Sequence, residues 1–82
     1  ANLCGAELID ANLQKAELVD AQLISAQLMG ADLAYANLIG ADLRGVDLKT
    51  ADLSHANLTA AEFIGATLSE ADLSGAKLSR AS

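Results

Sequence analysis

Three aspartates, Asp32, Asp52 and Asp72, recur at intervals of 20 residues, and the only tyrosine and the only histidine, Tyr35 and His55, are also 20 residues apart. Carboxylates held side by side could bind a divalent cation, because Mg²⁺ and Ca²⁺ prefer oxygen ligands. A tyrosine beside a histidine could transfer protons in acid–base catalysis. Either chemistry requires a fold that places residues 20 apart on one face.

The chain has a period of five residues from end to end. The middle position of each repeat, called the centre below, holds leucine in fifteen repeats and phenylalanine in one. Two residues before each centre stands alanine, or in one repeat Val46, and a mostly Asp, Asn, Glu or Gln residue lies between them. We predict that the centres form the core: Leu3, Leu8, Leu13, Leu18, Leu23, Leu28, Leu33, Leu38, Leu43, Leu48, Leu53, Leu58, Phe63, Leu68, Leu73 and Leu78.

Neither regular element explains a period of five. Five residues advance about 140° around an α-helix, so the leucines would form no stripe along it. A strand can place the alanine and the centre on one side, because they are two residues apart, but five is odd and the alternation cannot continue. The chain must therefore turn once per repeat. All six glycines fall two residues after a centre, where a turn could require a positive φ.

Short extended segments joined by regular turns form a solenoid, in which each coil covers the next and equivalent side chains stack. The motif A-[D/N]-L-x-x resembles the repeat of the pentapeptide-repeat family. It is carried by Ala31-Asp32-Leu33, Ala36-Asn37-Leu38, Ala41-Asp42-Leu43, Ala51-Asp52-Leu53 and Ala71-Asp72-Leu73. The resemblance implies an all-β fold, a right-handed quadrilateral β-helix with four pentapeptides in each 20-residue coil and about four coils.

We expect residues 1–82 to form a single solenoid domain of this kind. The repeat continues to Ser82 and neither end resembles a cap, so the terminal caps are expected to lie outside this domain. Coils lie about 4.8 Å apart, so only small side chains fit at the inward site before each centre. We expect Val46 to be accommodated there with slight local widening.

Composition excludes several functional classes. The net charge of −6 disfavours direct binding to nucleic acid or to an anionic membrane surface. Apolar runs of about four residues are far shorter than the roughly 18 that a transmembrane helix needs. Cys4 is the only cysteine, so no internal disulfide forms, and with one histidine there is no Cys/His metal cluster. A reducing compartment such as the cytoplasm is compatible with this cysteine content, and no cofactor is predicted.

With 20 residues per coil, Asp32, Asp52 and Asp72 would stack in one column. A flat ladder of carboxylates offers fewer than the six to eight oxygens that Ca²⁺ prefers, so we predict no metal site. Tyr35 and His55 would lie beside that column, packed edge to edge on the surface. No nucleophile or second base accompanies them, so we predict that the protein is not an enzyme.

Apolar residues crowd into the first half of the chain at the position just after the centre. The candidate interaction patch consists of Ile9, Val19, Ile24, Met29 and Ile39. Such a patch typically marks contact with a partner, although these side chains would also shield hydrogen bonds between coils. We therefore predict a rigid β-solenoid scaffold, structural or for protein–protein interaction, that meets a partner or a second copy through this patch or through its ends.

An acidic DNA mimic is the alternative function. Some pentapeptide-repeat proteins resemble B-form DNA in shape and charge and inhibit DNA gyrase. Four coils would make a rod of roughly 20 Å with about one net charge per 3 Å, whereas duplex DNA carries about one per 1.7 Å. The lower charge density favours a solvated surface with turn-forming aspartates over a mimic that binds a DNA-handling enzyme.

Overall fold

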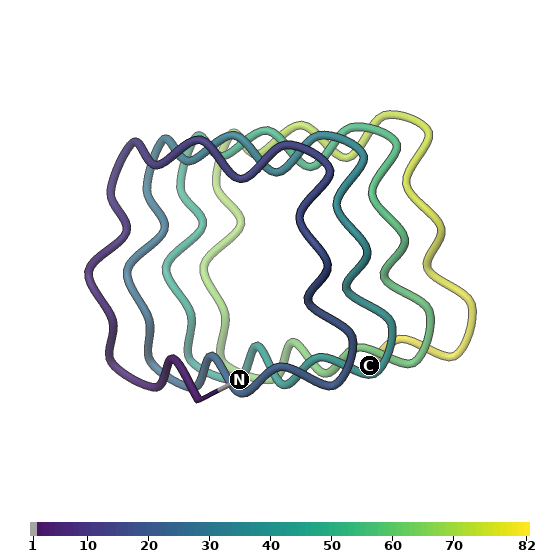
Figure 1. Ribbon diagram of the computed structural model, residues 1–82, viewed down its shortest axis with the longest axis horizontal. Helices are drawn as coiled ribbons and strands as arrows, with labels where there is room; N and C mark the ends of the chain where they lie inside the picture. The colour runs from purple at the N-terminus through teal and green to yellow at the C-terminus, as the bar shows by residue number, and fades with distance from the viewer. Residues whose placement is uncertain (1) are drawn as a thin grey trace.

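Parallel β-bridges join residues 20 positions apart in the computed structural model, which describes residues 2–82. Each bridged residue is the polar one before a centre and stands alone between two turns, so this part of the chain contains no longer strand and no helix. The bridges form four ladders: Asn2 with Gln22, Asp42 and Glu62; Glu7 with Gln27, Asp47 and Thr67; Asn12 with Asp32, Asp52 and Asp72; Glu17 with Asn37, Asn57 and Lys77. The chain is therefore a β-helix of parallel coils with a four-sided outline (Figure 1).

Each pentapeptide ends in a β-turn. In the first one, the Ala6 N–H donates a hydrogen bond of 3.0 Å to the Leu3 carbonyl, and Gly5 has a φ of 70°. A positive φ at the third residue of such a turn is the type II pattern. Ten of these third residues are not glycine, with φ between 58° and 62°: Asp10, Lys15, Asp20, Ser25, Tyr35, Thr50, His55, Ala60, Glu70 and Arg80. The repeat imposes a left-handed conformation on whichever residue stands there.

Ala60→Gly is expected to stabilise the protein by about 1 kcal/mol, because a non-glycine residue costs about 1 to 2 kcal/mol in the left-handed region. Ala60 has a φ of 61° and loses only a methyl group in this variant. Urea unfolding followed by circular dichroism measures the change. The reverse variant Gly5→Ala is the control, because a Cβ there would meet nothing within 4 Å and only the φ of 70° opposes it. Destabilisation by Ala60→Gly would contradict the argument.

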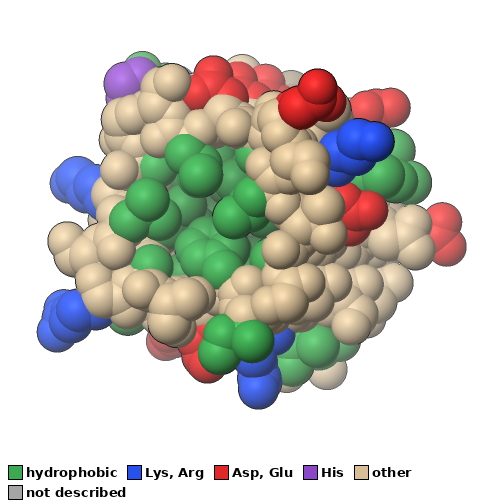
Figure 2. All heavy atoms as spheres, turned by 180° about the vertical axis from the view of Figure 1, so that it is seen from behind, with side chains coloured by type: hydrophobic (Ala, Val, Ile, Leu, Met, Phe, Trp, Pro, Cys, Tyr) green, Lys and Arg blue, Asp and Glu red, His purple; other side chains and the backbone are tan. Residues whose placement is uncertain are grey.

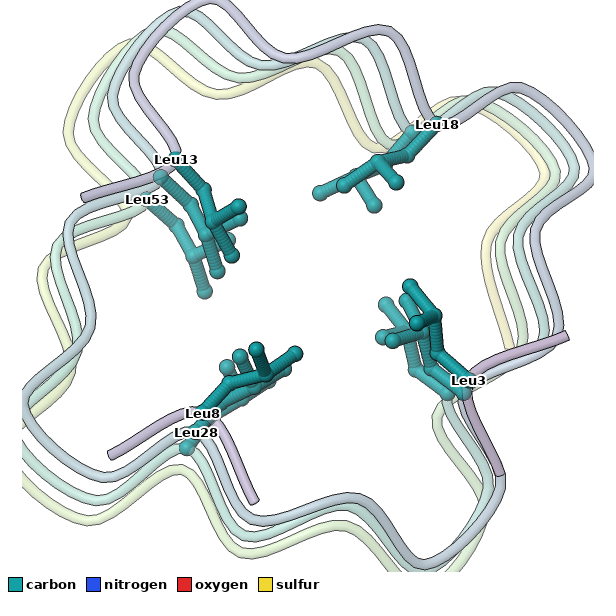
Figure 3. A pocket seen from close by; sticks show the side chains of 11 residues that line it. Leu3, Leu8, Leu13, Leu18, Leu28 and Leu53 are labelled. Carbon is teal, nitrogen blue, oxygen red and sulfur yellow. The ribbon is translucent and has the colours of Figure 1, made fainter. Parts of the chain in front are cut away.

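Alanine and leucine alternate in the interior, which is fully closed in the middle of the tube. Side chains from Ala21 to Ala61 at the two inward positions are at most 2% exposed. The leucines point to the axis in four columns (Figure 3). They enclose a narrow cavity of about 20 Å³ lined only by leucines, which leaves water no polar partner there.

Val46 is fully buried at a site that otherwise holds alanine. Its turn hydrogen bond to the Leu43 carbonyl is 3.2 Å, against 2.8 to 3.1 Å in the other turns. The Asp47 N–H reaches the Ala26 carbonyl at 3.1 Å, the longest bond between coils. The slight local widening expected at Val46 stays a prediction.

The two ends of the tube leave their leucines open. Leu3, Leu8, Leu13 and Leu18 at one end, and Phe63, Leu68 and Leu73 at the other, are only partly buried. Leu78, predicted as a core residue, is 45% exposed, because no coil within residues 2–82 covers it. Figure 2 shows hydrophobic side chains gathered in a hollow at one end, framed by backbone and polar groups.

Candidate functional site

Aspartates and asparagines of the four ladders have a structural role in the turns. At all nine ladder positions that hold Asp or Asn, a side-chain oxygen accepts a hydrogen bond of 2.9 to 3.3 Å from the backbone N–H two residues on. The residues are Asn2, Asn12, Asp32, Asn37, Asp42, Asp47, Asp52, Asn57 and Asp72. This is the local bond that Asp and Asn make in turns and that the longer Glu and Gln do not reproduce.

The column of Asp32, Asp52 and Asp72 forms as the 20-residue coil requires, through direct bridges between its members. Each carboxylate accepts a bond from its own turn, from the N–H of Ala34, Ser54 and Ser74 respectively. The described residues contain no group of three His, Cys, Asp or Glu side chains that could hold a metal ion. The three carboxylates therefore stabilise their own turns and do not converge on a common point.

Hydrogen bonds shift the pKa of two carboxylates, the half-buried Asp42 and the exposed Asp72. The Arg44 guanidinium donates to Asp42 at 2.6 and 2.8 Å and lowers the pKa of that carboxyl. The same contact raises the pKa of Arg44. Hydrogen bonding by the Ser74 side chain and backbone lowers the pKa of Asp72. In both aspartates the folded state therefore favours the ionised form.

Stability is expected to be constant from neutral pH down to about pH 5 and to fall below the ordinary aspartate pKa of 3.8. A pKa that folding lowers means that the unfolded chain binds protons more readily, so acid favours unfolding. Thermal melts from pH 7 to pH 2 measure the loss. Asp42→Asn with Asp72→Asn keeps the turn acceptors and should flatten the acid limb; an unchanged limb would contradict this assignment.

Tyr35 and His55 lie one above the other with ring centroids 4.8 Å apart and planes inclined by 14°. The predicted edge-to-edge packing is wrong, because the rings stack face to face. Both residues occupy the same left-handed turn position in successive coils, so their side chains leave the backbone in parallel. Gly75 is next in this column, and a Cβ there would come within 2.6 Å of His55 Nδ1. The pair is a surface stack held by the coil register.

The candidate interaction patch is spread over three of the four sides. Ile9 and Val19 are each 46% exposed, whereas Ile24, Met29 and Ile39 are half-buried. The coil register places Met29 next to Ile9 and Ile39 next to Val19, since Asp10 and Asp20 bond to the Met29 and Ile39 carbonyls.

Ile64, in the second half of the chain, is the most exposed large apolar side chain of the described residues, at 66%. It stands at the same position of the repeat as the members of the patch. Its position directly after a centre could have identified Ile64 as an outward apolar residue. The prediction omitted Ile64 because apolar residues at this position are concentrated in the first half of the chain.

No helix in residues 2–82 is both long enough and apolar enough to span a bilayer. A search of curated proteins finds no match. Among solved structures, the chain is similar to alr5209, a pentapeptide repeat protein from Nostoc PCC 7120, with 44% identity and a TM-score of 0.90 over 92% of this chain and 62% of that one. The chain thus spans less than two thirds of that relative's length.

Two further cyanobacterial structures are similar. Rfr23 from Cyanothece 51142 is 36% identical, with a TM-score of 0.54 over 93% of this chain and 55% of that one. HetL from Nostoc PCC 7120, described as involved in the regulation of heterocyst differentiation, is 34% identical, with a TM-score of 0.51 over 99% of this chain and 46% of that one.

The family model for pentapeptide repeats matches residues 1–26, 20–49 and 47–82, and these segments together cover the whole chain. The match agrees with the five-residue period, the turn in each repeat and the bridges between residues 20 apart. The chain belongs to the pentapeptide-repeat family.

Proposed function

We propose that residues 1–82 form one right-handed quadrilateral β-helix of about four coils that acts as a non-enzymatic scaffold for protein–protein contact. The observation that carries this proposal is the exposure of apolar side chains on the walls of the tube. Ile9 and Val19 each leave 46% of their surface in water, although the adjacent N–H groups of Asp10 and Asp20 are paired between coils.

A scaffold role also agrees with how the polar groups are used. The ladder aspartates bond to their own turns, and Tyr35 and His55 stack on each other. The axial cavity is lined by leucine alone, so it brings no polar group to a substrate. Repeated bonds between coils hold outward side chains at fixed spacing, which lowers the entropy that a partner must remove on binding.

The variant Ile9→Asp with Met29→Asp is expected to weaken association at least tenfold, because it places two charges in an apolar contact. Sedimentation velocity over a range of concentrations measures self-association of the chain. Ser69→Asp with Ser79→Asp is the matched control, since it adds the same charge at the same repeat position in the other half. Equal association of the two variants would remove the patch from the proposal. Inhibition of DNA gyrase by the unmodified chain would favour the acidic mimic instead.

A further inference from the structure

One wall of the tube separates its charges by sign along the tube axis. This side, called the Glu17 wall below, consists of residues 16–20, 36–40, 56–60 and 76–80. Its acidic residues, Glu17 and Asp20, lie in the first coil, and its basic residues, Lys77 and Arg80, lie in the fourth. All four are exposed, and none forms an ion pair within residues 2–82. Three coil spacings, about 14 Å, separate the two groups, so they cannot pair within one chain.

The two middle coils place no charge on the Glu17 wall. The outward residues there are Asn37, Ile39, Gly40, Asn57, Thr59 and Ala60. The Asp20 carboxylate lies over Gly40, where a Cβ would overlap it. The Thr59 hydroxyl donates a hydrogen bond of 2.6 Å to Asn57 on the same wall. The middle of the wall therefore holds short or already bonded side chains, which a flat partner surface can approach closely.

From this arrangement we infer that the Glu17 wall binds the Glu17 wall of a second copy, with the two tubes side by side and pointing in opposite directions. The inference rests on the proposed function and names the partner of one wall. The copies are related by a twofold axis that lies in the contact plane and crosses the tube between its second and third coils. The first coil of one copy then faces the fourth coil of the other.

This axis sets each column of outward side chains against the same column of the other copy. Glu17 faces Lys77, and the uncharged middles of the two walls meet each other. Asp20 faces Arg80, so the dimer contains four pairs of opposite charge. Tubes pointing in the same direction would instead set each residue against its own copy, which brings like charges together and opposes binding. The charges therefore select one orientation.

The other three walls do not complement themselves in this way. The same axis would oppose Asp10 to Glu70 on one wall and Asp32 to Asp52 on another. The remaining wall uses its only basic residue, Arg44, in an ion pair within the chain. The Glu17 wall also has no net charge, whereas the other three together carry the −6 of the chain. Repulsion between two copies is therefore weakest at the Glu17 wall.

One wall offers enough surface for a specific contact. The accessible surface of 4279 Å² belongs to a body of 26 × 21 × 20 Å, so each of its six faces contributes roughly 700 Å². Two walls that cover most of each other bury more than about 1,000 Å², the lower bound for specific interfaces. The contact uses only outward side chains, which a further coil at either end of the tube would not cover.

Charge exchange tests the pairing. Lys77→Glu with Arg80→Glu makes the wall entirely acidic, and Glu17→Lys with Asp20→Lys makes it entirely basic. Each variant alone is expected to self-associate at least about tenfold more weakly than the unmodified chain, because like charges then face each other. An equimolar mixture of the two should regain the affinity. The quadruple variant with all four substitutions keeps the net charge of −6 and should dimerise like the unmodified chain. Sedimentation equilibrium at about 150 mM salt measures each affinity.

Lys15→Glu with Lys49→Glu is the matched control, because it changes the net charge as much as the acidic variant does, but on two other walls. It should weaken association less than about threefold, since salt screens distant charges. Circular dichroism shows that each variant retains the fold.

Three results would overturn the inference. They are equal weakening by the control, a mixture that associates no better than either variant alone, and an unmodified chain that stays monomeric at millimolar concentration. If charge exchange has no effect while Ile9→Asp with Met29→Asp weakens association, the contact lies on the wall of Ile9, and the proposed function stands without this dimer.

Discussion

Leu38→Ala should lower the free energy of unfolding by about 3 to 5 kcal/mol, a large share of the stability of a domain of this size. Leu38 is fully buried and stands between Leu18 and Leu58 in one column of the β-helix. Its neighbours are fixed by bonds between coils, so the walls cannot collapse into the space that the leucine leaves. The loss therefore includes the cost of a cavity as well as the lost burial.

Leu78→Ala is the matched control, because it makes the same chemical change at the end of the same column, where the side chain is 45% exposed. Its cost should be below about 1 kcal/mol, since water already reaches much of this leucine. Urea unfolding with a common slope gives both values. Equal losses at the two positions would show that the column does not carry the stability of the tube.

Ala41→Leu is expected to destabilise by at least about 3 kcal/mol and in the limit to prevent folding, because overpacking a closed core displaces its backbone. Ala41 is 0% exposed and lies between Ala21 and Ala61 in adjacent coils. The inward site before the centre has room for little more than a methyl group. Val46 shows that valine can be fully buried at such a site.

Ala81→Leu at the open end of the same column is the control and should change stability by less than about 0.5 kcal/mol. Ala41→Val should fall between the two, at about 1 kcal/mol, as Val46 indicates. Thermal melts of the three variants give the order. If Ala41→Leu and Ala81→Leu have the same stability, the coils can separate without loss of stability, which would contradict this prediction.

The amino-acid sequence alone determined the repeat and the place of each residue in it. The odd period excludes one continuous helix or strand, and a glycine two residues after a centre indicates the left-handed turn that the structure contains. The small inward site and the bonds from Asp and Asn to the turn are local consequences of side-chain size and reach, so they could be predicted without a fold. The four-sided section and the 20-residue coil were predicted from the family resemblance. The five-residue spacing alone does not determine how many repeats make up one coil.

Tertiary structure decided what depends on neighbours 20 residues away. Tyr35 and His55 stack face to face because successive coils repeat the same backbone direction, which neither residue encodes by itself. Leu38 and Leu78 occupy identical places in the repeat, yet one is fully buried and the other is 45% exposed. The five-residue period predicts the same environment for all residues at one repeat position. Burial, however, depends on whether another coil packs above and below the residue, and only the tertiary structure shows this.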